Sequence, residues 1–207
     1  MGIGLLTEVS WRIVDLPLLI QLEFNIVSDP EAAATIFNLP ALAAKTTLIP
    51  LDVSHQVLAS KDILHLLHYG KRGSFSNDTK PSILRDMLVE LLCYFAETYA
   101  TVFGLADGPP LHDPIAVAAI FEGTEYAVPL YDYEEGQEDN HERFNVTIIT
   151  EGTHAQALNG EKETGRTIAT LLSPGRDGVK IPRSLNVPNF WRVLEDCLEK
   201  ADAINGR

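Results

Sequence analysis

The chain has 207 residues, of which 45% are hydrophobic and 22% charged, and its formal net charge is −13 at pH 7. This length and composition predict a single globular domain with a substantial apolar core. The acidic charge argues against partners that present phosphate groups, so we expect neither a nucleic acid nor an anionic membrane to bind.

The first residues and the first helix signal differ in character. Residues 1–22 alternate apolar and polar side chains, which is typical of a strand. Asp29 and Pro30 then form a helix start, with Asp29 as the N-cap and Pro30 at the first helical position. We expect this helix to cover residues 29–37 and to stop before Pro40. We expect no signal peptide and no membrane span, since the early apolar run is short.

A β-branched apolar stretch at residues 46–53 predicts a buried strand. Residues 61–69 predict a short helix that carries His65 and His68 three positions apart, on one face. That spacing could chelate a metal, but no third ligand is nearby, so a half-exposed helix face is the favoured interpretation. Residues 70–80 predict a polar loop.

The longest helical pattern covers residues 81–103, where apolar side chains recur every three or four positions. Gly104 follows as its C-cap. Phe95 and Tyr99 lie four residues apart near the end of this helix. Two interpretations stay open for them: aromatic packing in the core, or a platform for a ligand.

His112 and Asp113 stand directly before a predicted helix over residues 114–122. Pro114 suits the first helical position, and Asp113 suits the N-cap, where its carboxylate accepts backbone N–H groups. A helix cap is therefore one interpretation. The other is a functional site, because His112 titrates near neutral pH beside a carboxylate.

The remainder of the chain predicts short strands, loops and a final helix. The expected elements are strands at 122–128, 144–150 and 166–172, an acidic loop at 131–143, a glycine-containing loop at 152–165 and an amphipathic helix at 188–203. Cys93 and Cys197 both fall in helical patterns, so we expect two buried thiols and a cytoplasmic, reducing location.

Four short blocks, taken in order, resemble one known family. They are Glu23-Phe24-Asn25 with Asp29-Pro30-Glu31-Ala32-Ala33, then Pro50-Leu51-Asp52-Val53-Ser54-His55, then Leu111-His112-Asp113-Pro114, then Gly165-Arg166-Thr167. In order and spacing they resemble the C-terminal part of an inosine–uridine-preferring nucleoside hydrolase. The resemblance implies an α/β fold: the C-terminal portion of an open, mainly parallel sheet flanked by helices. Residues 1–22 do not match, and residues 23–207 are expected to form the partial hydrolase-like domain.

The resemblance implies hydrolysis of the N-glycosidic bond of a ribonucleoside, of the uridine or inosine type, to ribose and free base. The family uses Ca²⁺, which binds carboxylates and a diol together because it accepts many oxygen ligands. By match to the family blocks, Asp113 is a Ca²⁺ ligand, and His112 is the catalytic proton donor to the leaving base.

The same resemblance assigns the substrate contacts. Glu23 and Asn25 match a pair that binds ribose hydroxyls, and Phe24 packs against the sugar. Phe95 and Tyr99 fall near the positions that surround the base. The ribonucleoside is the expected partner, and a homo-oligomer the expected assembly.

One departure from the family limits these expectations. The family begins with an aspartate-rich motif that supplies most Ca²⁺ ligands and the base that activates water, and no such motif occurs in this chain. We therefore expect about the first half of the fold to be missing, residues 1–22 to come from a truncated or wrongly joined reading frame, and the chain to be incomplete for catalysis. The alternative function is a catalytically inactive fragment or an interaction subunit.

Overall fold

The structure, a computed structural model, describes residues 24–71, 80–132 and 141–205. The predicted strand at residues 1–22 lies outside these ranges. The chain divides into two compact units: residues 1–48 with 132–182, and residues 49–131 with 183–207. Among the described residues, no helix combines the length and apolar character that crossing a bilayer requires.

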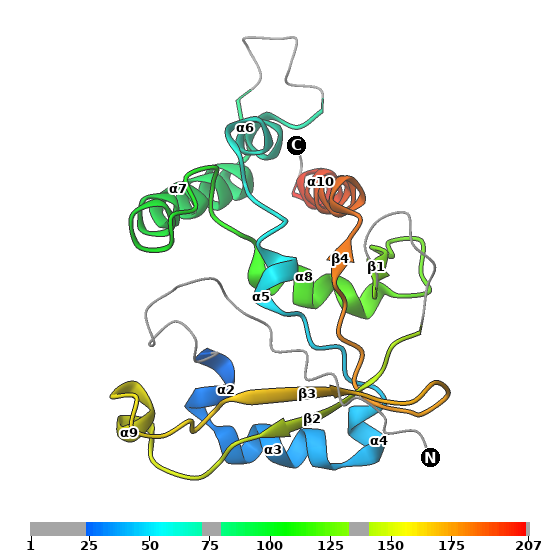
Figure 1. The fold of residues 1–207 in the computed structure, drawn as a ribbon. Helices are drawn as coiled ribbons and strands as arrows, with labels where there is room; N and C mark the ends of the chain where they lie inside the picture. The colour runs from blue at the N-terminus through cyan, green and yellow to red at the C-terminus, as the bar shows by residue number, and fades with distance from the viewer. Residues whose placement is uncertain (1–23, 72–79, 133–140, 206–207) are drawn as a thin grey trace. The chain divides into compact units, whose positions relative to one another are not determined.

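The first unit combines short helices with a two-stranded antiparallel sheet (Figure 1). Its elements are α2 (Phe24–Ser28), α3 (Pro30–Asn38), α4 (Pro40–Ala43), β2 (Phe144–Ile148), α9 (His154–Leu158) and β3 (Thr167–Leu171). In the sheet, Phe144 pairs with Leu171 and Ile148 with Thr167. Helix α3 packs along β2.

The core of the first unit follows from alternation along β2. Phe144, Val146 and Ile148 are buried, while the two residues between them are exposed. The buried face meets Ala33 and Phe37 of α3. This period of two places one face of the strand against the helix and the other in solvent.

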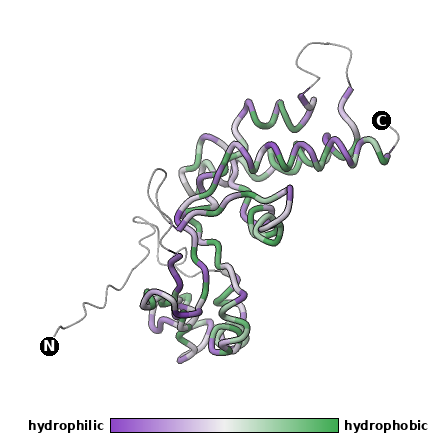
Figure 2. The backbone as a smooth tube through the Cα atoms, turned by 90° about the vertical axis from the view of Figure 1, so that its right-hand side faces the viewer, coloured by the Kyte–Doolittle hydropathy of each residue, from purple (hydrophilic) through white to green (hydrophobic). Residues whose placement is uncertain are grey.

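The second unit is mainly helical. Its elements are α5 (Leu51–Ser54), α6 (Lys61–Tyr69), α7 (Ile83–Phe103), α8 (His112–Ala118), the 3₁₀ helix η2 (Ala119–Phe121), β1 (Leu130–Tyr131), β4 (Ser184–Leu185) and α10 (Val187–Ile204). Strands β1 and β4 pair antiparallel. Hydrophobic and hydrophilic residues alternate along the helical segments (Figure 2), as expected of helices that bury one face.

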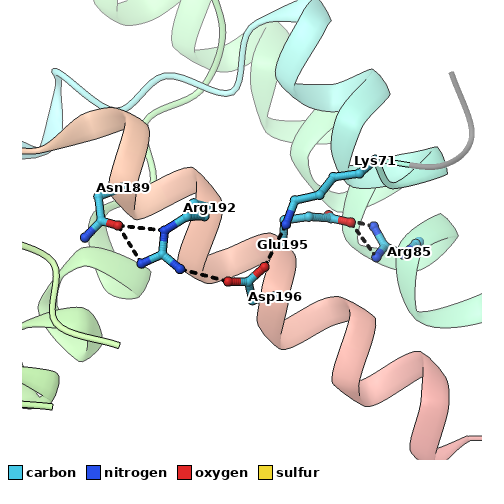
Figure 3. A network of polar contacts seen from close by, with 6 residues as sticks. All are labelled: Lys71, Arg85, Asn189, Arg192, Glu195 and Asp196. Atoms are coloured by element: carbon cyan, nitrogen blue, oxygen red, sulfur yellow. Dashed lines mark hydrogen bonds and ion pairs between the residues drawn. The ribbon is translucent and has the colours of Figure 1, made fainter. Parts of the chain in front are cut away.

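A buried ion pair links α7 to α10 in the second unit (Figure 3). Both terminal nitrogens of Arg85 donate to the carboxylate of Glu195, each at 2.9 Å. The Arg85 Nε donates to Asp202 at 2.6 Å, and Nη1 also donates to the Leu67 carbonyl at 2.7 Å. Because the two charges pair bidentately and the guanidinium finds further acceptors, both can be buried together.

Several predicted helices are confirmed. Asp29 caps α3 by accepting the Ala32 N–H at 2.9 Å, and the helix ends before Pro40. The predicted helix at 61–69 is α6, and the pattern at 188–203 is α10, one residue longer at each end. Helix α7 ends at Gly104, whose φ of +70° is the left-handed conformation expected of a glycine C-cap.

The expectation of an open, mainly parallel sheet is not confirmed, because both sheets among the described residues are two-stranded and antiparallel. The predicted strand at 46–53 is wrong. Thr47 makes an isolated parallel bridge to Lys180, and the chain then enters α5. Pro50, which has no N–H to give to a ladder, stands at that transition.

The predicted strand at 122–128 is also wrong. Its backbone groups are used in local turns: the Thr124 N–H bonds to Phe121 and the Ala127 N–H to Thr124. Gly123, at a φ of +80°, adopts a turn conformation rather than an extended one.

Two further expectations need correction. The predicted loop at 152–165 contains α9, because Thr153 and Gln156 form a capping box at its start. The two cysteines, expected to be buried, are both exposed. Cys93 and Cys197 lie in the expected helices, but other positions face the core: partly buried Leu88 and Leu92 of α7, and buried Leu198 of α10.

Candidate active site

The second unit brings a serine, two histidines and a tyrosine together at the start of α8. The Ser54 Oγ lies 2.7 Å from the Nδ1 of His112. The ring of His112 lies 5.5 Å from that of His55 and 6.0 Å from that of Tyr99, measured between centroids. These side chains come from the end of α5, the end of α7 and the first residue of α8.

Backbone pairing holds α5 and α8 in this arrangement. The Ala59 N–H donates to the Pro109 carbonyl at 2.9 Å, and the Leu111 N–H donates to the Val57 carbonyl at 3.1 Å. The turn directly before Pro109 requires glycine. Gly108 has a φ of +136°, and a Cβ there would lie 2.3 Å from the Ala59 carbonyl oxygen. The approach of His112 to Ser54 is therefore set by the backbone.

The surroundings of the two histidines favour their neutral forms. Burial lowers the pKa of His112 below its usual value, and the neighbouring His55 lowers it further, against an opposing effect of Asp113. Burial also lowers the pKa of His55, against the attraction of Asp52. A protonated His112 is consequently a stronger acid than a solvated histidine, and so is better able to give up its proton.

Asp113 does not cap the helix as expected. Helix α8 begins at His112 with Leu111 in the N-cap position, and no side chain caps it. Pro114 therefore occupies the third helical position, which is permitted because the first four N–H groups of a helix have no partner within it. Asp113 remains in the first turn, exposed, where its charge faces the positive end of the helix dipole.

The residues expected to contact ribose belong to the first unit. Glu23 lies outside the described residues, and Phe24 is the first residue of α2. Asn25 is exposed and also lies in α2. The structure describes Asn25 and His112 in separate units.

The two aromatic residues expected near the base behave differently. Tyr99 is half-buried, and its ring lies close to that of His112. Burial raises the pKa of Tyr99, as does the nearby charge of Asp113. Phe95 is 44% exposed and makes an edge-to-face contact with Tyr94. Of the pair, Tyr99 is therefore the residue that the described contacts join to the histidine.

The described residues do not fit a metal ion. No group of three or more His, Cys, Asp or Glu side chains among them could hold one. Ca²⁺ takes six to eight oxygen ligands, and Asp113 supplies at most two. His68 pairs with Asp86 at 2.5 Å, and the His65 ring lies against Tyr69, so these histidines have protein partners.

Sequence reasoning missed two members of the site, Ser54 and His55. Both lie in the block Pro50-Leu51-Asp52-Val53-Ser54-His55, which contributed to the family resemblance but gave no reason to place them beside His112. Ser54 and His112 are 58 positions apart, and no local pattern records a contact over that separation.

The fold has counterparts among known proteins. The model of the inosine-uridine preferring nucleoside hydrolase family matches residues 19–192. A purine-preferring ribonucleoside hydrolase from Gardnerella vaginalis is structurally similar, with a TM-score of 0.53 and 23% identity, over 84% of this chain and 44% of that one. These matches define an α/β nucleoside hydrolase fold, and the chain belongs to the inosine–uridine preferring nucleoside hydrolase family.

Curated relatives agree with this assignment. A uridine nucleosidase from Saccharomyces cerevisiae is 28% identical over 185 residues, which are 88% of this chain and 48% of the relative. An inosine–uridine preferring nucleoside hydrolase from Crithidia fasciculata is 27% identical over 180 residues, 86% of this chain and 46% of the relative. The chain therefore spans about half the length of these relatives.

Proposed function

We propose that this chain takes part in hydrolysis of the N-glycosidic bond of ribonucleosides of the uridine or inosine type. In this proposal it supplies the residues on the base side of the reaction, and it is incomplete for catalysis alone. Family membership supports the reaction type. The proposal that this chain supplies the base-side residues is supported by the cluster of His112, Ser54 and Tyr99 at the start of α8.

In this proposal His112 is the proton donor. A departing purine or pyrimidine leaves with the electron pair of the broken C–N bond, and a proton delivered to the base stabilises it as it leaves. Half-burial of His112 and the neighbouring His55 make the imidazolium a stronger acid. Tyr99 is proposed to contact the base beside this histidine, and Phe95 to lie one helical turn away on α7.

The sugar side is proposed to involve Glu23 and Asn25 as hydrogen-bonding partners of the ribose hydroxyls, with Phe24 packed against the ring. Carboxylate and amide groups suit this role because each offers acceptors, and the amide also offers donors, to a vicinal diol. A Ca²⁺ ion would need ligands beyond the described residues, with Asp113 as one of them, and no step is assigned to it. The two free thiols suit the cytoplasm as the place of action.

Nucleoside binding and turnover test this proposal separately. Inosine and uridine should each give saturable changes in the NMR spectrum of the chain, with and without CaCl₂. His112→Ala should weaken these changes, whereas His65→Ala, at an exposed position on α6, should leave them intact. Release of free base should stay at the level of buffer.

Each result has a clear contrary outcome. Absence of nucleoside binding would contradict the proposed substrate. Equal binding by the His112→Ala variant would remove His112 from the site. Calcium-dependent release of base by the chain alone would contradict its incompleteness, and loss of that release in Asp113→Asn would identify a metal ligand.

A second candidate function is an interaction subunit, with another copy of this chain as its partner. Large apolar side chains lie exposed along α7: Ile83 is 88% exposed, Met87 60% and Leu91 53%. Their spacing of four residues places them on one face of the helix. Exposed apolar stripes of this kind favour association.

Sedimentation velocity at increasing protein concentration tests the second candidate. Because each copy carries a net charge of −13, association should strengthen as salt screens the repulsion. Ile83→Gln with Met87→Gln should abolish it, whereas Val117→Gln, at an exposed site on α8, should not. A monomer at all concentrations and salt levels would exclude this candidate.

A further inference from the structure

Ser54 places a buried hydroxyl oxygen beside the candidate proton donor. The residue is 2% exposed at the end of α5, and its Oγ lies 2.7 Å from the Nδ1 of His112. The backbone bonds that join residues 57–59 to residues 109–111 hold the two elements together. Nδ1 is therefore committed to this contact, and a group that approaches the other nitrogen of the ring meets Nε2.

The hydroxyl makes a second contact, which fixes the direction of the first. Ser54 Oγ donates to the Leu51 carbonyl at 3.2 Å, a local bond of the kind that serine forms in helices. The same carbonyl accepts the His55 N–H at 2.8 Å, and its two lone pairs allow both bonds. A hydroxyl has one hydrogen, and a carbonyl only accepts. Both contacts of Oγ are therefore hydrogen bonds only when Nδ1 of His112 carries a hydrogen and donates it to Oγ.

Donation from Nδ1 to Oγ is compatible with both charge states of the ring. The imidazolium carries hydrogen on both nitrogens, so Nδ1–H is held by Ser54 while Nε2–H is available to another group. When Nε2 gives up its proton, the product is the neutral ring with its hydrogen on Nδ1. That tautomer makes the same bond to Ser54, so the bond to the Leu51 carbonyl also stays in place.

We propose that Ser54 is a positioning residue that accepts the Nδ1–H of His112 and so presents Nε2 to the nucleoside. This inference rests on the proposed function, in which His112 gives a proton to the leaving base. In that step the C–N bond breaks, its electron pair goes to the base, and the proton moves from Nε2 to the base. The hydrogen on Nδ1 stays with Ser54, which need not touch the nucleoside.

The nitrogen chemical shifts of the imidazole test this inference in the full chain. In a spectrum that correlates ring protons with ring nitrogens, recorded at pH 8, His112 should show a protonated Nδ1 and an unprotonated Nε2. A solvated neutral histidine carries its hydrogen mainly on Nε2, so the expected pattern is the reverse of the ordinary one. Ser54→Ala removes the acceptor, and should move Nδ1 toward the unprotonated shift and Nε2 toward the protonated shift. Ser54→Thr, which keeps a hydroxyl, should preserve the wild-type pattern.

His65 is an internal control in the same spectra, because it lies exposed on α6 and should show equal shifts in all three proteins. A wild-type His112 with its hydrogen on Nε2 would overturn the inference without any variant. An unchanged pattern in a folded Ser54→Ala protein would overturn it too, as would equal loss in both variants, which would assign the pattern to packing. The measurement needs neither nucleoside nor turnover. Absence of nucleoside binding would therefore contradict the proposed function alone, and the other tautomer would contradict this inference alone.

Discussion

The cores of the two units are built from different interactions. In the first, an apolar face of β2 packs against α3, and buried residues alternate with exposed ones along the strand. In the second, helices enclose an apolar core that also contains the paired charges of Arg85 and Glu195. The comparison teaches that the core of the first unit is apolar contact between a strand and a helix, whereas the core of the second also holds a buried pair of charges.

The largest expected effect comes from breaking the buried pair. Arg85→Met leaves the carboxylate of Glu195 buried without its cation, and should lower the free energy of unfolding by about 3–5 kcal/mol. Denaturant unfolding measures this loss, and amide hydrogen exchange should place it in the second unit. Lys71→Met is the matched control: it removes the exposed partner of Asp196 and should cost at most about 1 kcal/mol.

Restoring neutrality sharpens the same test. Arg85→Met combined with Glu195→Leu removes both charges, so most of the stability should return. Equal losses in the Arg85→Met and Lys71→Met variants would mean that the buried pair has no special role in the second unit.

A smaller effect is expected in the core of the first unit. Ile181 is 1% exposed, and Ile181→Val deletes one methylene from a closely packed site, which should cost about 0.5–1.5 kcal/mol. Amide exchange should accelerate in β2 and β3. Leu171→Val, at a side chain that is 38% exposed, is the control and should change stability by less than about 0.5 kcal/mol. Faster exchange confined to the second unit would contradict the division between the cores.

The smallest effect concerns pH and the two histidines of the second unit. His55 and His112 have pKa values lowered by burial, so the unfolded chain binds more protons than the folded chain as the pH falls below about 6.5. The free energy of unfolding is therefore not reduced by these histidines above that pH. It decreases as the pH falls below the histidine pKa of the unfolded chain, because protons then bind more strongly to the unfolded state. Denaturant midpoints at pH 7.5 and pH 5.5 should show this loss.

Substitution assigns the pH effect to these residues. His55→Gln should reduce the difference between the two midpoints, whereas His154→Gln, at an exposed site in the first unit, should not. A pH dependence identical in the wild type and both variants would remove His55 from the explanation.

The sequence supported accurate prediction wherever the signal was local. The Asp29-Pro30 cap, the glycine stop at Gly104 and the apolar period of α10 each involve residues within a few positions of one another. Predictions failed where two backbone conformations competed at the boundary of an element. Pro50 ended a β-branched stretch that was expected to be a strand, and α8 began two residues before Pro114. In both cases proline was compatible with more than one backbone path.

The site was predictable in part for the same reason. His112 and Tyr99 came from resemblance and spacing, and the structure brings their rings together. Ser54 could not be found this way, because its contact depends on how residues 57–59 pair with residues 109–111. A single hydroxyl has no periodic signature, and only the folded chain brings it to its partner.

The exposed thiols have a practical consequence. The chain has two cysteines, one on α7 and one on α10, the helices that the Arg85–Glu195 pair joins. Spin labels attached at Cys93 and Cys197 would therefore report the separation of these helices without any engineered attachment site. The same native positions would follow the opening of the second unit during unfolding, independently of the first.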